Sequence, residues 1–342
     1  MYEMLPKTHY ERASSYLVEN NMFGLIDQAI RQVGPDPTYE QFALVFKDQL
    51  DSIQTKREQY LYSNYLNIFF HILHMKTSGE KIYYVTPSLV AKLTCSEANI
   101  DSFFLRSPFR EIFVQIDPGF FYIRDIDSKR VPVHGFYVHL REDQGKKFLR
   151  VMASSLLEPT PEIPFNDSTF YFKMEIGPGS LIEEIKKFQN NIIGQQHIDP
   201  QNNLEYMKDF STFVFNTLLY LTSKNADIVT KEPEKLADKL ASLKSTGKKR
   251  KLQKRMDKVS SYRVFMVGSN IVFNDLSDIK KYGSIGSWKL NKQIRVSGHF
   301  REQWYGSEKD GTRHQELIWI DSFIKGPEIA DVMNKKIIVK ER

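Results

Sequence analysis

The spacing of apolar residues changes near residue 100, and this change limits the folds open to the chain. Before it, apolar side chains recur at roughly helical intervals over 8–32, 38–53, 58–75 and 87–99. After it come short β-like runs separated by turn signals, at 112–116, 120–123, 133–140, 148–152 and 170–174. The sequence therefore predicts an α+β fold, with a helical N-terminal part followed by an antiparallel β meander.

Further apolar segments extend this organisation to the C-terminus. A second core helix is expected over 204–222, and short strands are expected at 263–267, 294–297 and 316–321. The predicted division is a helical region 1–100, an α+β domain 101–240, a basic linker 241–262, a small basic β-rich module 263–326 and a tail 327–342.

Two local signals within the helical part are specific enough to state by residue. Thr38 follows a Gly-Pro-Asp-Pro breaker, and Gln41 comes three residues later, which predicts a capping box at a helix start. His71 and His74 are spaced i, i+3 on an apolar helix, a spacing that can serve one metal ion. Since no carboxylate or third histidine lies nearby in sequence, we expect helix histidines with hydrogen-bond partners and no metal.

Charge is distributed unevenly along the chain. Residues 241–342 hold 22 Lys and Arg against 11 Asp and Glu, whereas residues 1–240 hold 26 against 31. The densest basic run is Lys248, Lys249, Arg250 and Lys251, among Gly, Ser and Thr residues. Such a run favours contact with a polyanion, and we predict nucleic-acid binding there. A plain flexible hinge is the alternative.

Composition and missing motifs exclude several classes of protein. The single cysteine, Cys95, permits no intrachain disulfide. The N-terminus lacks the apolar core of a signal peptide, and no run is long enough to span a membrane, so we expect a cytoplasmic protein without membrane contact. P-loop, dinucleotide-binding, HExxH, CxxC and GxSxG patterns are absent from the sequence, and no cofactor is expected.

The segments 294–306 and 313–326 combine arginine, histidine and aromatic residues at short range. Arg295, Arg301 and Arg313 are candidates for forked contacts with phosphate oxygens. Phe300, Trp304, Tyr305 and Trp319 offer faces on which bases can stack. The alternative is a β-hairpin whose aromatic residues build a small core.

A catalytic hypothesis also arises from this segment. His299 is a candidate general acid or base for phosphodiester cleavage, with Arg301 stabilising the developing charge. One histidine with one nearby arginine leaves the assignment of an enzyme open, and a ribonuclease is the reaction class it would support.

The same residues carry a resemblance to a known family. Gly298-His299-Phe300-Arg301, the turn at Tyr305-Gly306 and the strand 317–320 resemble the C-terminal motif of an anti-CRISPR family of phages and plasmids, the type V-A (AcrVA-type) inhibitors. Residues 218–228 are similar to the core helix of that family and the acidic turn that ends it. The resemblance covers about residues 105–325.

The resemblance implies an unusual activity. The characterised relative recognises the emerging N-terminal peptide of its target Cas nuclease and causes loss of the encoding message. The implied partners are a nascent peptide and RNA or the ribosome, in the host cytoplasm. A ribonuclease acting through His299 and Arg301, or a non-enzymatic DNA- or RNA-binding accessory protein, remains as an alternative.

Overall fold

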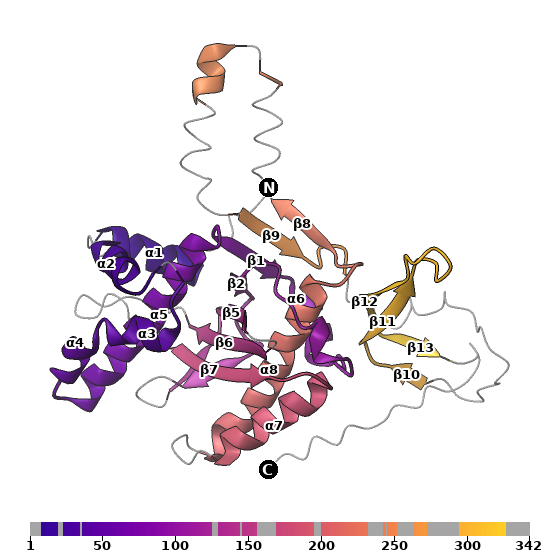
Figure 1. The fold of residues 1–342 in the computed structure, drawn as a ribbon, viewed down its shortest axis with the longest axis horizontal. Helices are drawn as coiled ribbons and strands as arrows, with labels where there is room; N and C mark the ends of the chain where they lie inside the picture. The colour runs from indigo at the N-terminus through magenta and orange to yellow at the C-terminus, as the bar shows by residue number, and fades with distance from the viewer. Residues whose placement is uncertain are drawn as a thin grey trace.

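A seven-stranded sheet runs through the centre of the protein in the order β7-β6-β5-β2-β1-β9-β8 (Figure 1). Its strands are β1 Lys81–Val85, β2 Glu111–Gln115, β5 Gly135–Asp143, β6 Lys146–Ser154, β7 Thr169–Ile176, β8 Ile228–Lys231 and β9 Arg263–Val267. The computed structural model describes residues 8–19, 23–34, 36–124, 129–143, 146–155, 169–194, 200–231, 242–243, 245–251, 263–271 and 294–325.

The sheet is antiparallel at both ends and parallel in the middle. Strands β2, β5, β6 and β7 pair in sequence as antiparallel neighbours, which confirms the predicted meander except for the strand expected at 120–123, whose residues 122 and 123 pair outside this sheet. Strand β1 pairs in parallel with both β2 and β9, and β8 closes the other edge antiparallel to β9. A separate two-stranded ribbon joins β3 Tyr122–Arg124 to β4 Arg130–Pro132. The α+β class is confirmed.

The sheet crosses the boundaries of the predicted domain division. Strand β1 lies within residues 1–100, which the sequence presents as helical, and β9 lies at the start of the predicted C-terminal module. Both are central strands that share a complete register from Lys81 opposite Arg263 to Val85 opposite Val267. Residues 81–85 and residues 263–267 therefore belong to one hydrogen-bonded sheet.

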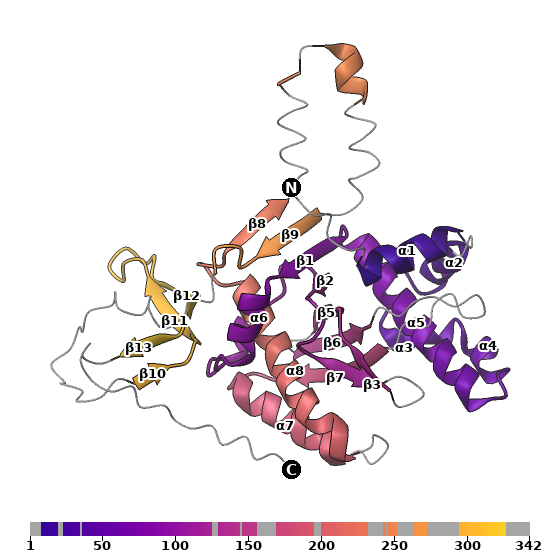
Figure 2. The same ribbon diagram turned by 180° about the vertical axis from the view of Figure 1, so that it is seen from behind.

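The N-terminal helices cover one face of the sheet (Figures 1 and 2). They are α1 His9–Glu19, α2 Phe23–Val33, α3 Tyr39–Leu44, α4 Lys47–Asp51 and α5 Lys56–Thr77. Thr38 accepts from the backbone N–H of Gln41, whose side chain accepts from the N–H of Thr38, so the predicted capping box is confirmed. Helix α5 packs Phe70 and Ile72 into a core shared with Phe113 of β2.

A second helical layer covers the opposite face. It consists of α6 Pro87–Thr94, α7 Leu181–Gly194 and α8 Pro200–Leu221, with a short 3-10 turn, η1, at Ser102–Phe104. Helix α8 buries Phe213, Leu218 and Leu219 completely against the sheet and α6. Among the helices that the structure describes, none is both long enough and apolar enough to cross a membrane.

Buried histidines lie between α5 and the sheet, around one carboxyl group. Glu111 of β2 is fully buried, and hydrogen bonds join its two oxygens to His71 Nδ1 at 2.8 Å and His139 Nδ1 at 3.0 Å. His74 Nε2 donates to the carbonyl oxygen of Pro37 at 3.2 Å. His9 Nδ1 of α1 lies 2.9 Å from the hydroxyl of Tyr137. The contacts of His9 and His71 fasten α1 and α5 to the sheet, and that of His74 fastens α5 to the loop before α3.

Burial shifts the proton equilibria of this cluster. Desolvation lowers the pKa of His9 to about 3, that of His74 to about 4 and that of His139 to about 2, and it holds the pKa of His71 well below its ordinary value. Desolvation also raises the pKa of Glu111, against an opposing effect of the Arg150 charge. The folded protein therefore excludes protons from its buried imidazoles at neutral pH.

We predict that the free energy of unfolding falls as the pH falls below about 6.5, because the unfolded chain then binds protons that these histidines refuse in the folded state. Each histidine contributes about 1.4 kcal/mol per pH unit, until the pH reaches its folded-state pKa. The raised pKa of Glu111 acts in the opposite direction and reduces this slope at pH values above the ordinary pKa of glutamate. Urea unfolding at a series of pH values measures the slope.

Two variants make this measurement specific. His139→Gln retains a donor for Glu111 and should reduce the slope by about one proton. His314 is exposed, and its pKa is raised by the Thr312 carbonyl, so His314→Gln should leave the slope below pH 6.5 nearly unchanged. A wild-type stability that is flat or rising on acidification would contradict the assignment of neutral buried histidines.

Candidate functional site

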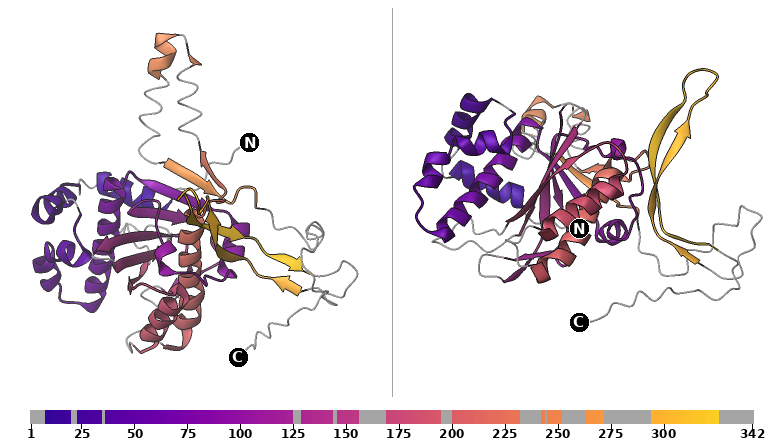
Figure 3. Two further views of the ribbon diagram at one scale, coloured as in Figure 1. Left: turned by 45° about the vertical axis from the view of Figure 1, so that its right-hand side comes forward. Right: turned by 60° about the horizontal axis from the view of Figure 1, so that its bottom comes forward.

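The segment that combines arginine and aromatic residues folds into a β-hairpin, here called the C-terminal hairpin (residues 299–320). Strand β11 His299–Tyr305 pairs antiparallel with β12 His314–Ile320, and the flanking strands β10 Ile294–Val296 and β13 Phe323–Lys325 pair with each other. The turn begins at Gly306, whose φ of 78° suits glycine, and an added Cβ would lie 2.3 Å from the carbonyl oxygen of Thr312. Figure 3 shows the hairpin extending away from the helices and the central sheet.

One face of the hairpin is anchored to the protein by apolar side chains near its base. Phe300 and Trp319 are cross-strand partners, so they share a face with each other and with Leu317. All three are buried in the core that contains α6 and α8, and the Trp319 ring meets Tyr220 edge to face at 5.3 Å. The alternative interpretation of a small aromatic core is thus correct for Phe300 and Trp319.

Polar contacts hold both edges of the hairpin base. The side chain of Asn225 bonds the backbone of Trp319 twice, as donor to its carbonyl oxygen at 2.7 Å and as acceptor from its N–H at 2.9 Å. On the other edge, the backbone of Glu97 bonds Gly298 and Phe300. A side chain at Gly298 would place its Cβ 2.9 Å from Ser96 Oγ, so glycine permits this close approach.

The register places Arg301 and Arg313 on opposite faces of the hairpin. Arg301 is paired with Ile318, and its side chain lies on the face opposite to that of its neighbour Phe300. Arg313 lies on the other face, where its guanidinium group stacks over the ring of Trp304 at 4.4 Å and pairs with Glu308 at 2.7 Å. The two arginines do not form a shared surface toward one phosphate chain.

Tyr305 lies on the same face as Arg301, close to the loop after α8. The ammonium group of Lys224 sits 3.6 Å from the Tyr305 ring centroid and pairs with Glu316 at 2.5 Å. His314 stacks on Tyr305 and lies 3.1 Å from Glu316. Trp304 and Tyr305, the two predicted stacking rings that are not buried, are therefore already in contact with cations of the protein itself.

The formal charge of this part of the chain is balanced. Residues 294–325 contain five Lys and Arg and five Asp and Glu. The basic surplus of the last hundred residues comes instead from residues 241–293 and, to a small extent, from residues 326–342. A phosphate-binding surface needs a net positive charge. The numbers of basic and acidic residues in this part of the chain are equal, so it has no such surplus.

His299 and Arg301 are two residues apart in β11, so their side chains lie on the same face of the strand, as the catalytic hypothesis requires. His299 Nδ1 donates to the carbonyl oxygen of Ser297 at 3.2 Å, which leaves Nε2 as the proton-accepting nitrogen of the neutral ring. His299 is half-buried where β11 meets Glu97, and Arg301 is exposed. No described group of three or more His, Cys, Asp or Glu residues could hold a metal ion.

The remaining predicted residues lie elsewhere. Lys248, Lys249, Arg250 and Lys251 are exposed on a helical turn within residues 245–251, here called the basic segment. Figures 1 and 3 show this segment, in orange, at a distance from the C-terminal hairpin. Arg295 is central in β10, opposite Ile324, and its side chain lies outside the described part of the chain.

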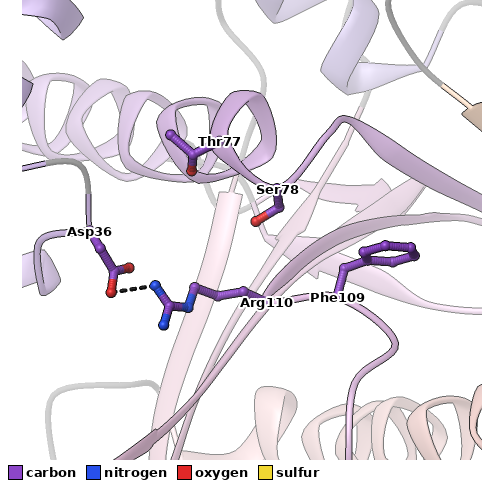
Figure 4. A pocket seen from close by; sticks show the side chains of 5 residues that line it. All are labelled: Asp36, Thr77, Ser78, Phe109 and Arg110. Carbon is purple, nitrogen blue, oxygen red and sulfur yellow. Dashed lines mark ion pairs between the residues drawn. The ribbon is translucent and has the colours of Figure 1, made fainter.

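A pocket that sequence reasoning missed lies near the C-terminal end of α5 (Figure 4). It has a volume of about 390 Å³ and is lined by Asp36, Thr77, Ser78, Phe109 and Arg110. Arg110 forms an ion pair with Asp36 across it. Its residues come from three separate parts of the sequence, so no local pattern could have indicated it.

Comparison with known proteins decides the family. The model of the AcrVA2-like family, described as anti-CRISPR type V subtype A2, matches residues 83–322. The chain belongs to the AcrVA2-like anti-CRISPR family. The match confirms the resemblance found in the sequence and extends it upstream to β1.

The family match spans most of the central sheet, the helices α6 to α8 and the C-terminal hairpin. Among solved structures, the chain is similar to one titled "Crystal structure of AcrVA2", with 13% identity, a TM-score of 0.47, and coverage of 93% of this chain and 100% of that one. A comparison with curated proteins gives no match.

The hairpin contains one buried tryptophan, Trp319, and one exposed tryptophan, Trp304. The two form a matched pair for a stability test. We predict that Trp319→Ala lowers the free energy of unfolding by about 3–5 kcal/mol, because it empties a buried ring site against Tyr220. Trp304 is 50% exposed on the same face, and Trp304→Ala should change it by about 0.5 kcal/mol or less. Chemical denaturation of both variants measures this, and similar losses in the two would contradict the anchoring of the base.

Proposed function

We propose that this protein, as an anti-CRISPR of the AcrVA2-like family, recognises the nascent N-terminal peptide of a Cas nuclease and lowers that nuclease's expression. The observation that carries the proposal is the family match over residues 83–322. The site of action would be the host cytoplasm, where the target is translated. The partners would be the peptide and the translating ribosome or its message.

The hairpin supports a contact with protein more than with phosphate. Its base is held on both edges by Asn225 and Glu97, so its outer part projects from a fixed support. That outer part exposes Trp304 under the guanidinium group of Arg313, with balanced charge around it. Aromatic residues and arginine are enriched at protein interfaces, whereas nucleic-acid surfaces carry a net positive charge.

The basic segment is the better candidate for nucleic-acid contact. Lys248, Lys249, Arg250 and Lys251 are consecutive and all exposed, and residues 241–262 hold eight Lys and Arg against one Asp. In this proposal the folded protein binds a peptide, and the basic segment contributes non-specific affinity for ribosomal RNA or message.

Recoding the target tests peptide recognition directly. Two versions of a Cas nuclease gene are co-expressed with the protein, one with synonymous codons at its start and one with compensating frameshifts that change the peptide but few nucleotides. The proposal predicts loss of message and protein for the synonymous version and normal levels for the frameshifted one. Equal repression of both, or repression that follows the nucleotide sequence, would refute peptide recognition.

Salt dependence tests the basic segment. Alanine at residues 248–251 should remove up to about four phosphate contacts. The slope of the logarithm of RNA affinity against the logarithm of salt concentration should then become shallower by roughly 0.7 per lost contact for single-stranded RNA. The matched control is Arg301→Ala with Arg313→Ala, which removes two exposed arginines and should change the slope less. Filter binding across salt concentrations measures both. A larger effect in the hairpin variant would move the RNA contact to the hairpin.

A further inference from the structure

The strand β7 is an edge of the central sheet with an open side. It pairs with β6 over eight positions, from Lys147 opposite Ile176 to Ser154 opposite Thr169, and the described residues place no strand on its other side. Figure 1 shows β7 at the outer end of the sheet. The opposite edge, β8, has only four residues. An edge of this length presents a row of backbone groups that can pair with another strand.

The side chains on β7 are complementary to a second copy of β7 that runs antiparallel. Lys173 and Glu175 are exposed and lie two residues apart, on the same face of the strand. When a two-fold axis passes through Met174, Lys173 of each copy is opposite Glu175 of the other, and opposite charges at such positions attract. An axis through Lys173 would instead oppose two lysines, so the charge pattern selects one register.

The aromatic residue on this face fits the same register. Tyr171 is 48% exposed, on the face that carries Lys173 and Glu175. With the axis at Met174, Tyr171 is opposite Gly177 of the partner subunit, where no side chain obstructs the ring. Aromatic rings pack well over cross-strand glycines at sheet edges. The pairing would therefore cover an apolar surface that the single chain leaves in water.

Lys173 and Glu175 already form ion pairs within the single chain, and these pairs do not prevent new ones with a second copy. Lys173 pairs with Glu40 at 3.0 Å, and Glu175 pairs with Lys146 at 2.6 Å. All four side chains are more than half exposed, and exposed ion pairs contribute little to stability. Pairing across the edge replaces them with two equivalent contacts and adds backbone hydrogen bonds.

We propose that two copies of this protein associate through β7, antiparallel about Met174, so that their two central sheets continue into one. The symmetry of the contact is isologous, as in most homodimers. Each dimer would then carry two C-terminal hairpins. The opposing possibility is that Lys173 protects the edge against pairing, which is a common use of lysine on edge strands.

Charge reversal distinguishes the two possibilities. Lys173→Glu opposes two carboxylates at both symmetric positions, and Glu175→Lys opposes two ammonium groups, so each should weaken dimerisation at least about tenfold. The double variant K173E/E175K restores complementary pairs and should dimerise like the wild type. The control is R313E/E308R, which reverses the ion pair Arg313–Glu308 at the turn of the C-terminal hairpin, outside the central sheet, and should have no effect.

Sedimentation equilibrium of the full chain over a wide concentration range provides the readout. Association of the wild type, its loss in both single variants and its recovery in the double variant are the expected results. A wild-type protein that stays monomeric at all concentrations would overturn the proposal and assign Lys173 a protective role. Association that all variants retain would place the contact elsewhere.

Discussion

The parallel pairing of β1 with β9 is the contact on which the rest of the structure depends. It joins residues 81–85 to residues 263–267 across some of the longest sequence separations in the sheet, and it makes both strands central. Because Gly268 follows β9 directly and hydrogen-bonds Asp227, the pairing also fixes the loop after α8. That loop supplies Asn225, which holds the edge of β12. The sheet therefore helps to position the hairpin, together with the backbone contacts of Glu97 and the buried residues of the hairpin base.

The aromatic residues of the hairpin have two different roles, although they are interleaved in the sequence. Near the base, Phe300, Leu317 and Trp319 are buried and serve stability. Toward the turn, Trp304 and Arg313 are exposed and stacked on each other. Its charges are balanced, so the basic character of the C-terminal third resides in residues 241–293, of which the described basic segment is part. We propose a peptide contact at the hairpin and an electrostatic contact at the basic segment.

Local patterns predicted much of this fold, and non-local pairing accounts for what they missed. The capping box at Thr38, the helix over α5 and the strands of the meander each rest on residues a few positions apart. Strand β1 directly follows the apolar helix α5 and has no turn pattern of its own beyond Gly79. The partner of His71 is Glu111, forty residues away, and the opposite facing of Arg301 and Arg313 depends on a register that composition does not contain.

We propose that the protein engages a ribosome through the peptide that emerges from it. Sequencing the message fragments protected by ribosomes that co-purify with the protein tests this most directly. If the protein binds the emerging peptide, target footprints are enriched only downstream of the point at which the N-terminus has left the exit tunnel. Enrichment that begins at the start codon, or footprints no richer in target message than total ribosomes, would contradict it.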